Sequence, residues 1–149
     1  MKIKLCGMFR ECDIDYANEA KPDYIGFVLE FPKSHRSVDF ETAKRLRTRL
    51  APGIKAVGVF VDSPETTCAE YANRDIRDVI QRLGSEGADY ISRLRKLVPP
   101  EVLFVSESGI RTAADVAALR ENGTNAVLIG ETLMRSPEKK AALAELRGR

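Results

Sequence analysis

The sequence predicts an α/β protein with a parallel β-sheet, because short apolar runs alternate with longer segments of helical spacing. The runs are apolar throughout rather than alternately polar, which is typical of strands buried on both faces. The chain has 149 residues, enough for one core, and no linker or shift in composition divides it. We therefore expect a single domain over residues 1–149.

Six strands are expected, each followed by a helix. The strand runs cover residues 3–6, 24–28, 56–61, 78–81, 102–105 and 126–129. The helical segments cover roughly residues 11–20, 39–50, 64–73, 87–97, 112–122 and 136–147. Serine followed by proline at positions 63–64 and 136–137 marks two helix starts. The regular strand–helix–strand spacing favours right-handed βαβ crossovers.

Composition and charge exclude several classes of function. The chain has 24 Lys and Arg against 22 Asp and Glu, a net charge of +2, which argues against nucleic acid as a partner. No apolar stretch approaches the roughly 18 residues of a spanning helix, and the N-terminus lacks signal-peptide features. We expect no membrane partner and a cytoplasmic location. Three cysteines without a paired spacing and a single histidine predict reduced thiols and no metal site.

The carboxyl ends of the strands are where chemistry is expected in such a fold. Cys6 ends the first run, where a thiol could act as a base or nucleophile; a buried apolar cysteine is the equal alternative. Cys12 and Cys68 fall on predicted helices, where a structural role is expected. In the loop 30–37, Lys33, His35 and Arg36 could hold an anion, Arg36 by gripping a carboxylate with two hydrogen bonds. The alternative is a solvated basic loop.

Two glycine-bearing segments follow the last two strand runs. Ser108-Gly109 and Gly130-Glu131 lie just after these runs, each near a helix start. Backbone N–H groups in such loops converge on phosphate, and the last two loops of a (β/α)8 barrel commonly form this site. The alternative is a pair of tight turns without a ligand.

The N-terminal part of the chain resembles phosphoribosylanthranilate isomerase. The resemblance covers about the first 97 residues, and its most specific elements are the short motifs KxCG, GFV, KSxR and GVFV. They correspond to Lys4–Gly7, Gly26–Val28, Lys33–Arg36 and Gly58–Val61. The resemblance implies a TIM-barrel-like (β/α) repeat, here truncated to about six βα units.

The C-terminal part resembles a different family. Residues 105–112 and 126–135 are similar to the last two βα units of indole-3-glycerol phosphate synthase, which catalyses the next step of tryptophan biosynthesis on a related barrel. The chain therefore reads as the first four units of one barrel joined to the last two of another.

The first resemblance implies a cofactor-free Amadori rearrangement of N-(5′-phosphoribosyl)anthranilate. Cys6 would be the general base that removes the proton from ribose C2′, and Arg36 would hold the anthranilate carboxylate. Gln81, at the end of the fourth run, would contact the substrate. The phosphate would lie on the backbone of Ser108, Gly109, Gly130 and Glu131.

Three departures weigh against full activity. A barrel of this type takes at least about 200 residues, the family's general-acid aspartate has no counterpart, and its histidine after strand four is replaced in Gln81-Arg82-Leu83-Gly84. One alternative is a non-catalytic half-barrel that binds a phosphorylated ligand or a partner chain. A lower-ranked alternative is an indole-3-glycerol phosphate synthase-like lyase. Six parallel strands leave two free edges, so we also expect self-association, as a homodimer or otherwise.

Overall fold

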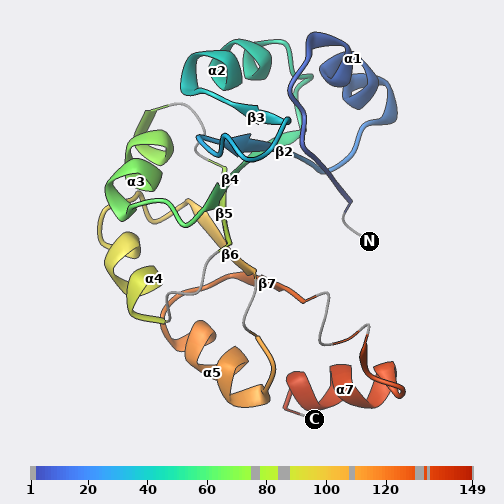
Figure 1. Ribbon diagram of the computed structural model, residues 1–149, viewed down its shortest axis with the longest axis vertical. Coiled ribbons are helices and arrows are strands. Elements are labelled where there is room, and N and C mark those ends of the chain that lie inside the picture. Colours follow the sequence, from blue (N-terminus) through green and yellow to red (C-terminus); the bar gives the residue numbers. More distant parts are fainter. Residues whose placement is uncertain are drawn as a thin grey trace.

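The computed structural model describes residues 3–74, 78–83, 88–107, 110–129, 133 and 135–148. Strands and helices alternate from one end of the chain to the other, as the apolar runs predict (Figure 1). The strands are β1 (Lys4–Cys6), β2 (Tyr24–Leu29), β3 (Ser37–Val38), β4 (Lys55–Val61), β5 (Val79–Leu83), β6 (Leu103–Glu107) and β7 (Ala126–Leu128). The helices are α1 (Glu11–Ala20), α2 (Phe40–Thr48), α3 (Glu65–Arg74), α4 (Ala88–Arg95), α5 (Ala113–Glu121) and α7 (Lys139–Leu146).

The strands form one parallel sheet in the order β1-β2-β4-β5-β6-β7, with β3 added beside β2. The sheet curves, and the helices lie on its outer, convex side (Figure 1). This arrangement confirms the predicted TIM-barrel-like α/β fold with six main βα units. Among the described residues the sheet is not closed, and β1 and β7 are its two edges.

Two layers of apolar side chains hold the sheet in place. On the outer face, Ile25, Phe27 and Leu29 of β2 are fully buried against the helices. On the inner face, alternate residues of the strands form a second, smaller cluster around Val57, Val59 and Val79. Burial on both faces explains why the strand runs are continuously apolar rather than alternating.

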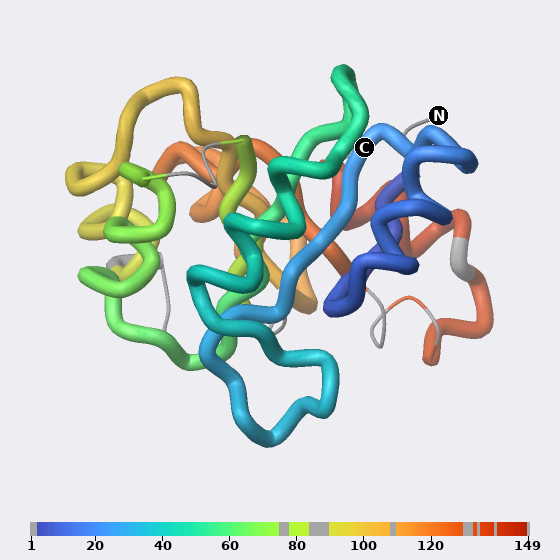
Figure 2. The backbone as a smooth tube through the Cα atoms, turned by 90° about the horizontal axis from the view of Figure 1, so that it is seen from above, coloured from blue at the N-terminus to red at the C-terminus, as the bar shows by residue number. Residues whose placement is uncertain are grey.

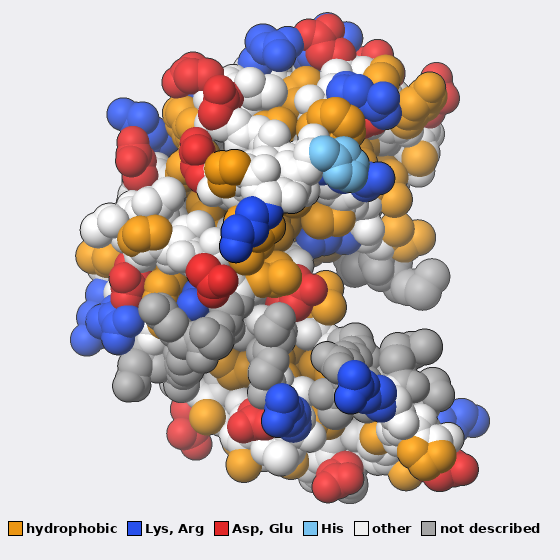
Figure 3. Space-filling model, in the orientation of Figure 1, with side chains coloured by type: hydrophobic (Ala, Val, Ile, Leu, Met, Phe, Trp, Pro, Cys, Tyr) orange, Lys and Arg blue, Asp and Glu red, His pale blue; other side chains and the backbone are white. Residues whose placement is uncertain are grey.

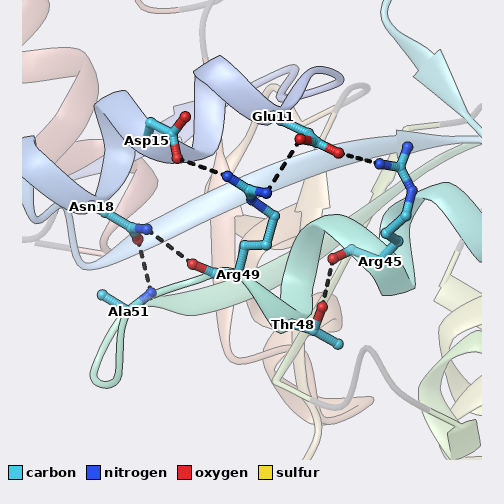
Figure 4. Close-up of polar contacts among 7 residues, drawn as sticks. All are labelled: Glu11, Asp15, Asn18, Arg45, Thr48, Arg49 and Ala51. Carbon is cyan, nitrogen blue, oxygen red and sulfur yellow. Dashed lines mark hydrogen bonds and ion pairs between the residues drawn. The ribbon is translucent and has the colours of Figure 1, made fainter.

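The first two helices are tied together by polar side chains (Figure 4). Arg49, just after α2, donates hydrogen bonds to Glu11 at 3.2 Å and to Asp15 at 3.4 Å on α1. Asn18 accepts a hydrogen bond from the backbone N–H of Ala51 at 2.8 Å and donates one to the carbonyl of Arg49 at 2.9 Å. Exposed ion pairs contribute little, so Asn18 is the group that fixes this turn.

The prediction missed one strand and ended two others too early, namely the fourth main strand and β6, which runs to Glu107 rather than to residue 105. β3 was not predicted, because a strand of two residues leaves no periodic pattern; it pairs Ser37 with Val28 and Val38 with Leu29. The fourth main strand runs to Leu83 rather than ending at Gln81, since its pairing continues on both sides, with Val61 of β4 and Glu107 of β6.

Burial decreases toward the C-terminal units. α5 has no buried residue, and Leu128 of β7 is 40% exposed. Figure 3 shows a hollow between the upper part of the molecule, which carries α1 and α2, and the lower part, which carries α5 and α7. Across the described ranges, none of the helices is both long and apolar enough to cross a membrane.

Candidate active site at the carboxyl end of the sheet

The Cys6-Gly7 turn at the end of β1 is shaped by close packing. The backbone N–H groups of Gly7 and Met8 both donate to the carbonyl of Gly26, at 2.9 and 3.0 Å. A Cβ atom at Gly26 would lie 2.9 Å from the Cys6 sulfur, so glycine at this position makes room for the thiol. Cys6 is exposed and is therefore not the buried apolar cysteine of the alternative interpretation.

Arg36 lies directly over this turn. Gly7 has a φ of +81°, a conformation that favours glycine, and a Cβ there would meet the Arg36 side chain at 2.9 Å. Arg36 is exposed, and its Nε donates to His35 at 3.4 Å. The structure thus places the Arg36 side chain against the turn that follows Cys6, although the two residues come from separate motifs.

The loop that carries Arg36 is ordered by its own hydrogen bonds. It projects from one end of the molecule (Figure 2). The hydroxyl of Ser37 accepts from the backbone N–H of Phe31 at 2.8 Å, and the N–H of Ser37 donates to the carbonyl of Ser34 at 3.0 Å. Tyr71 on α3 donates to the carboxylate of Glu30 at 2.5 Å, and burial together with this carboxylate raises the pKa of Tyr71. The basic side chains therefore stand on a fixed loop.

A row of polar side chains crosses the inner face of the sheet. Lys4 of β1 donates from Nζ to Oε1 of Gln81 on β5, and Nε2 of Gln81 donates to Oε2 of Glu107 on β6. Gln81 is 4% exposed and lies within its strand, so it is a buried link rather than a loop residue. Sequence reasoning did not assign Lys4 and Glu107 to the site; a lysine and a glutamate on inward positions of apolar strands were the available signal.

The two remaining cysteines lie on helices, as the sequence predicts. Cys68 is buried on α3 with its sulfur 3.2 Å from the hydroxyl of Tyr90, and burial raises its pKa, as expected for a structural thiol. Cys12 is exposed on α1. The predicted phosphate-binding residues lie outside the described residues: Ser108, Gly109, Gly130 and Glu131.

The parallel sheet, its outer helices and the polar carboxyl end define a TIM-barrel-type βα-repeat protein. Residues 72–146 match the sequence model of the family described as indole-3-glycerol phosphate synthase. The chain belongs to this family through that segment, which includes β5, β6 and β7.

The N-terminal part is similar to another group of proteins. An N-(5′-phosphoribosyl)anthranilate isomerase of Thermoanaerobacter pseudethanolicus is 45% identical over 95 residues, which cover 64% of this chain and 46% of that protein. The indole-3-glycerol phosphate synthase of Ruminiclostridium cellulolyticum is 68% identical over 56 residues, 38% of this chain and 22% of that protein. The chain therefore spans about half the length of the curated isomerases that it matches.

Solved structures show the same fold. The phosphoribosyl anthranilate isomerase of Thermotoga maritima superposes with a TM-score of 0.68 at 24% identity, over 88% of this chain and 63% of that one. A mutant tryptophan synthase alpha-subunit of Pyrococcus furiosus gives a TM-score of 0.74 at 18% identity, over 100% of this chain and 67% of that one. These likenesses show that the chain has the fold of these proteins over most or all of its length.

Proposed function

We propose that the chain is an isomerase that converts N-(5′-phosphoribosyl)anthranilate to its ribulose form, with weak turnover. The observation that carries the proposal is the packing of Arg36 against the Cys6-Gly7 turn, at the strand end where barrel proteins bind their substrates. The 45% identity to an isomerase over 95 residues supports the proposal. The resemblance of about the first 97 residues also supports it, since this part includes β1, β2, β4 and the loop 30–37. A related isomerase structure holds a reduced carboxyphenylamino-deoxyribulose phosphate, which has a carboxylate and a phosphate at its two ends.

In this mechanism the two residues act on different parts of the substrate. The thiolate of Cys6 removes the proton from C2′, and the Arg36 guanidinium holds the anthranilate carboxylate by two hydrogen bonds. The phosphate lies on the backbone of Ser108-Gly109 and Gly130-Glu131. No metal or cofactor takes part.

A coupled isomerase assay on the purified chain tests the proposal. We expect Cys6→Ser to abolish most of the activity, because near neutral pH a hydroxyl forms its basic anion far less readily than a thiol does. Cys68→Ser serves as the control. Arg36→Ala should chiefly raise KM. Activity unchanged in Cys6→Ser would mean that the thiol is structural and the proposed function wrong.

We also propose that the functional form is a self-associated one, such as a homodimer. Within the described part of the chain, β1 and β7 have no neighbour on one side, and Ile3 beside β1 and Leu128 on β7 are 49% and 40% exposed. Exposed edges with apolar side chains favour pairing. The molar mass in solution tests this: a monomer at micromolar concentration that unfolds cooperatively would contradict it.

A second candidate function is a non-catalytic half-barrel that binds a phosphorylated ligand. The open sheet favours it, because a site assembled from fewer units positions its substrate less closely. Tight binding of the substrate without turnover in the same assay would select this candidate.

A further inference from the structure

We infer that Glu107 donates the proton that the isomerisation requires, in place of the aspartate that the chain lacks. This inference rests on the proposed function. It starts from the polar row on the inner face of the sheet, where Lys4, Gln81 and Glu107 are joined by hydrogen bonds although 77 and 26 residues of sequence separate them.

The strand register places Glu107 on the same face as the thiol. On β5 and β6, Leu83 and Val105 belong to the inner apolar cluster, and Gln81 and Glu107 are each two residues away from one of them. Successive side chains of a strand point to opposite faces, so Gln81 and Glu107 point inward as well. Lys4 reaches Gln81 across this face, and Cys6 lies two residues further along β1.

Both Glu107 and Cys6 are the last residues of their strands. β6 ends at Glu107 and β1 ends at Cys6, and all strands of the sheet run parallel. An acid and a base therefore stand at the same end of the sheet and on the same face, one from β1 at one edge and one from β6, which lies next to the other edge. With this arrangement one group can give a proton to one side of a substrate while the other takes a proton from the opposite side.

The hydrogen bonds fix the orientation of the carboxyl group. Gln81 is buried, and its amide oxygen accepts from Lys4, so its amide nitrogen must face Glu107. Oε2 of Glu107 is held by this amide. Glu107 is half-buried, and its second oxygen, Oε1, has no side-chain partner within the described part of the chain and is the one that can reach a ligand.

The proton transfers balance with these two residues. The carboxylic acid of Glu107 gives its proton to the ring oxygen of the ribose, the bond from C1′ to that oxygen breaks, and the nitrogen lone pair forms the C1′ iminium. Cys6 thiolate then takes the proton from C2′, and the electron pair left behind neutralises the iminium as an enolamine. The Cys6 thiol then gives its proton to C1′, and the enol proton passes through water to the Glu107 carboxylate, which gives the ketone and restores both residues.

The test compares Glu107→Gln with the wild-type chain in the coupled isomerase assay. Glutamine keeps the size of the side chain and an oxygen for Gln81, but it has no carboxyl proton. We expect kcat to fall at least about 100-fold with KM little changed, since one positioned proton donor is worth about 10² to 10⁴ in rate. Glu101→Gln, an exposed glutamate just before β6, is the matched control and should leave kcat unchanged. Glu107→Asp should retain part of the rate.

Chemical rescue separates proton donation from a packing role. Glu107→Ala should lose activity, and added formate, a small carboxylic acid, should restore part of it. If the folded variant loses activity and formate does not restore it, the side chain acts by packing and the inference is wrong.

The outcomes also separate this inference from the proposed function. Turnover that depends on Cys6 but not on Glu107 would overturn only the inference about Glu107. A wild-type chain with no turnover above the uncatalysed rate would overturn both.

Discussion

The sharpest test of the fold near the site is the removal of the Asp13 carboxylate. Asp13 is the third residue of α1, and its Oδ2 accepts hydrogen bonds from the backbone N–H groups of Phe9 at 3.1 Å and Arg10 at 3.0 Å. Its Oδ1 accepts a further one from Arg10 Nη2 at 2.9 Å. These bonds fix the segment that leads from the Cys6-Gly7 turn into the helix.

The size of the effect follows from burial. The Asp13 side chain is 10% exposed, so water does not readily replace the carboxylate when Asp13→Ala removes it. Each backbone donor left without a partner costs about 1 to 3 kcal/mol. Allowing for partial hydration of the freed donors, we expect the free energy of unfolding to fall by about 2 to 4 kcal/mol for the two of them.

Asp115 provides a matched comparison at the start of α5. Its Oδ2 accepts from the N–H groups of Arg111 at 3.0 Å and Thr112 at 2.9 Å, the same local geometry, but in a helix with no buried residue. Water can take over these bonds, so Asp115→Ala should cost clearly less than Asp13→Ala. Urea unfolding with unchanged m-values measures both losses. A loss in Asp13→Ala no larger than that in Asp115→Ala would refute the argument from burial.

Further predictions concern the pH dependence of Tm and the backbone conformation at the end of α1. Burial raises the pKa of Asp13, but the hydrogen bonds from Arg10 and Phe9 outweigh it and leave the pKa below its usual value. The ionised carboxylate therefore stabilises the fold fully above the unfolded pKa of about 3.9, and this stabilisation is lost as the pH falls through the lower folded pKa. Asp13→Asn should accordingly flatten the fall of Tm below about pH 4. Lys21, which ends α1 with a φ of 48°, occupies a conformation that favours glycine, so Lys21→Gly should stabilise the chain by about 0.5 to 1 kcal/mol. Glu19→Gly, within the same helix, should instead destabilise it by about 1 kcal/mol. If Lys21→Gly lowered the free energy of unfolding as much as Glu19→Gly, the backbone of Lys21 would not be strained and the reasoning would be wrong.

Patterns that recur along the chain were predictable, and contacts between distant segments were not. The apolar runs gave every main strand to within a few residues, because double-sided burial demands continuous apolar side chains. Thr112 and Asp115 have the residue types and spacing of a capping box, and the structure forms it. The capping box at Asp13 was not visible, because its N-cap residue is Arg10, which is outside the usual serine, threonine and asparagine signals.

In the candidate site, too, local motifs were predictable and contacts between distant segments were not. Cys6 and Arg36 stand in short motifs that can be recognised by their resemblance to a known family. Only the structure shows that Arg36 packs against the turn that follows Cys6. The link from Lys4 through Gln81 to Glu107 joins three strands, and no local pattern in any of them specifies it. The end of β5 was misplaced for a related reason: polar Arg82 looks like the start of a loop until its pairing with β4 and β6 is known.

The gradient of burial allows the proposed chemistry and the proposed phosphate site to be tested separately. The inner apolar cluster reaches from Tyr24 of β2 to Val105 of β6. Glu107 lies on β6, and Cys6 lies on β1, which pairs with β2. β7 contributes no buried side chain, and α5 none either. A weakened phosphate site would therefore raise KM while the dependence of kcat on Cys6 and Glu107 persisted. If kcat did not depend on Cys6 and Glu107, the roles proposed for these two residues would be wrong, because the core that holds them does not rely on the C-terminal units.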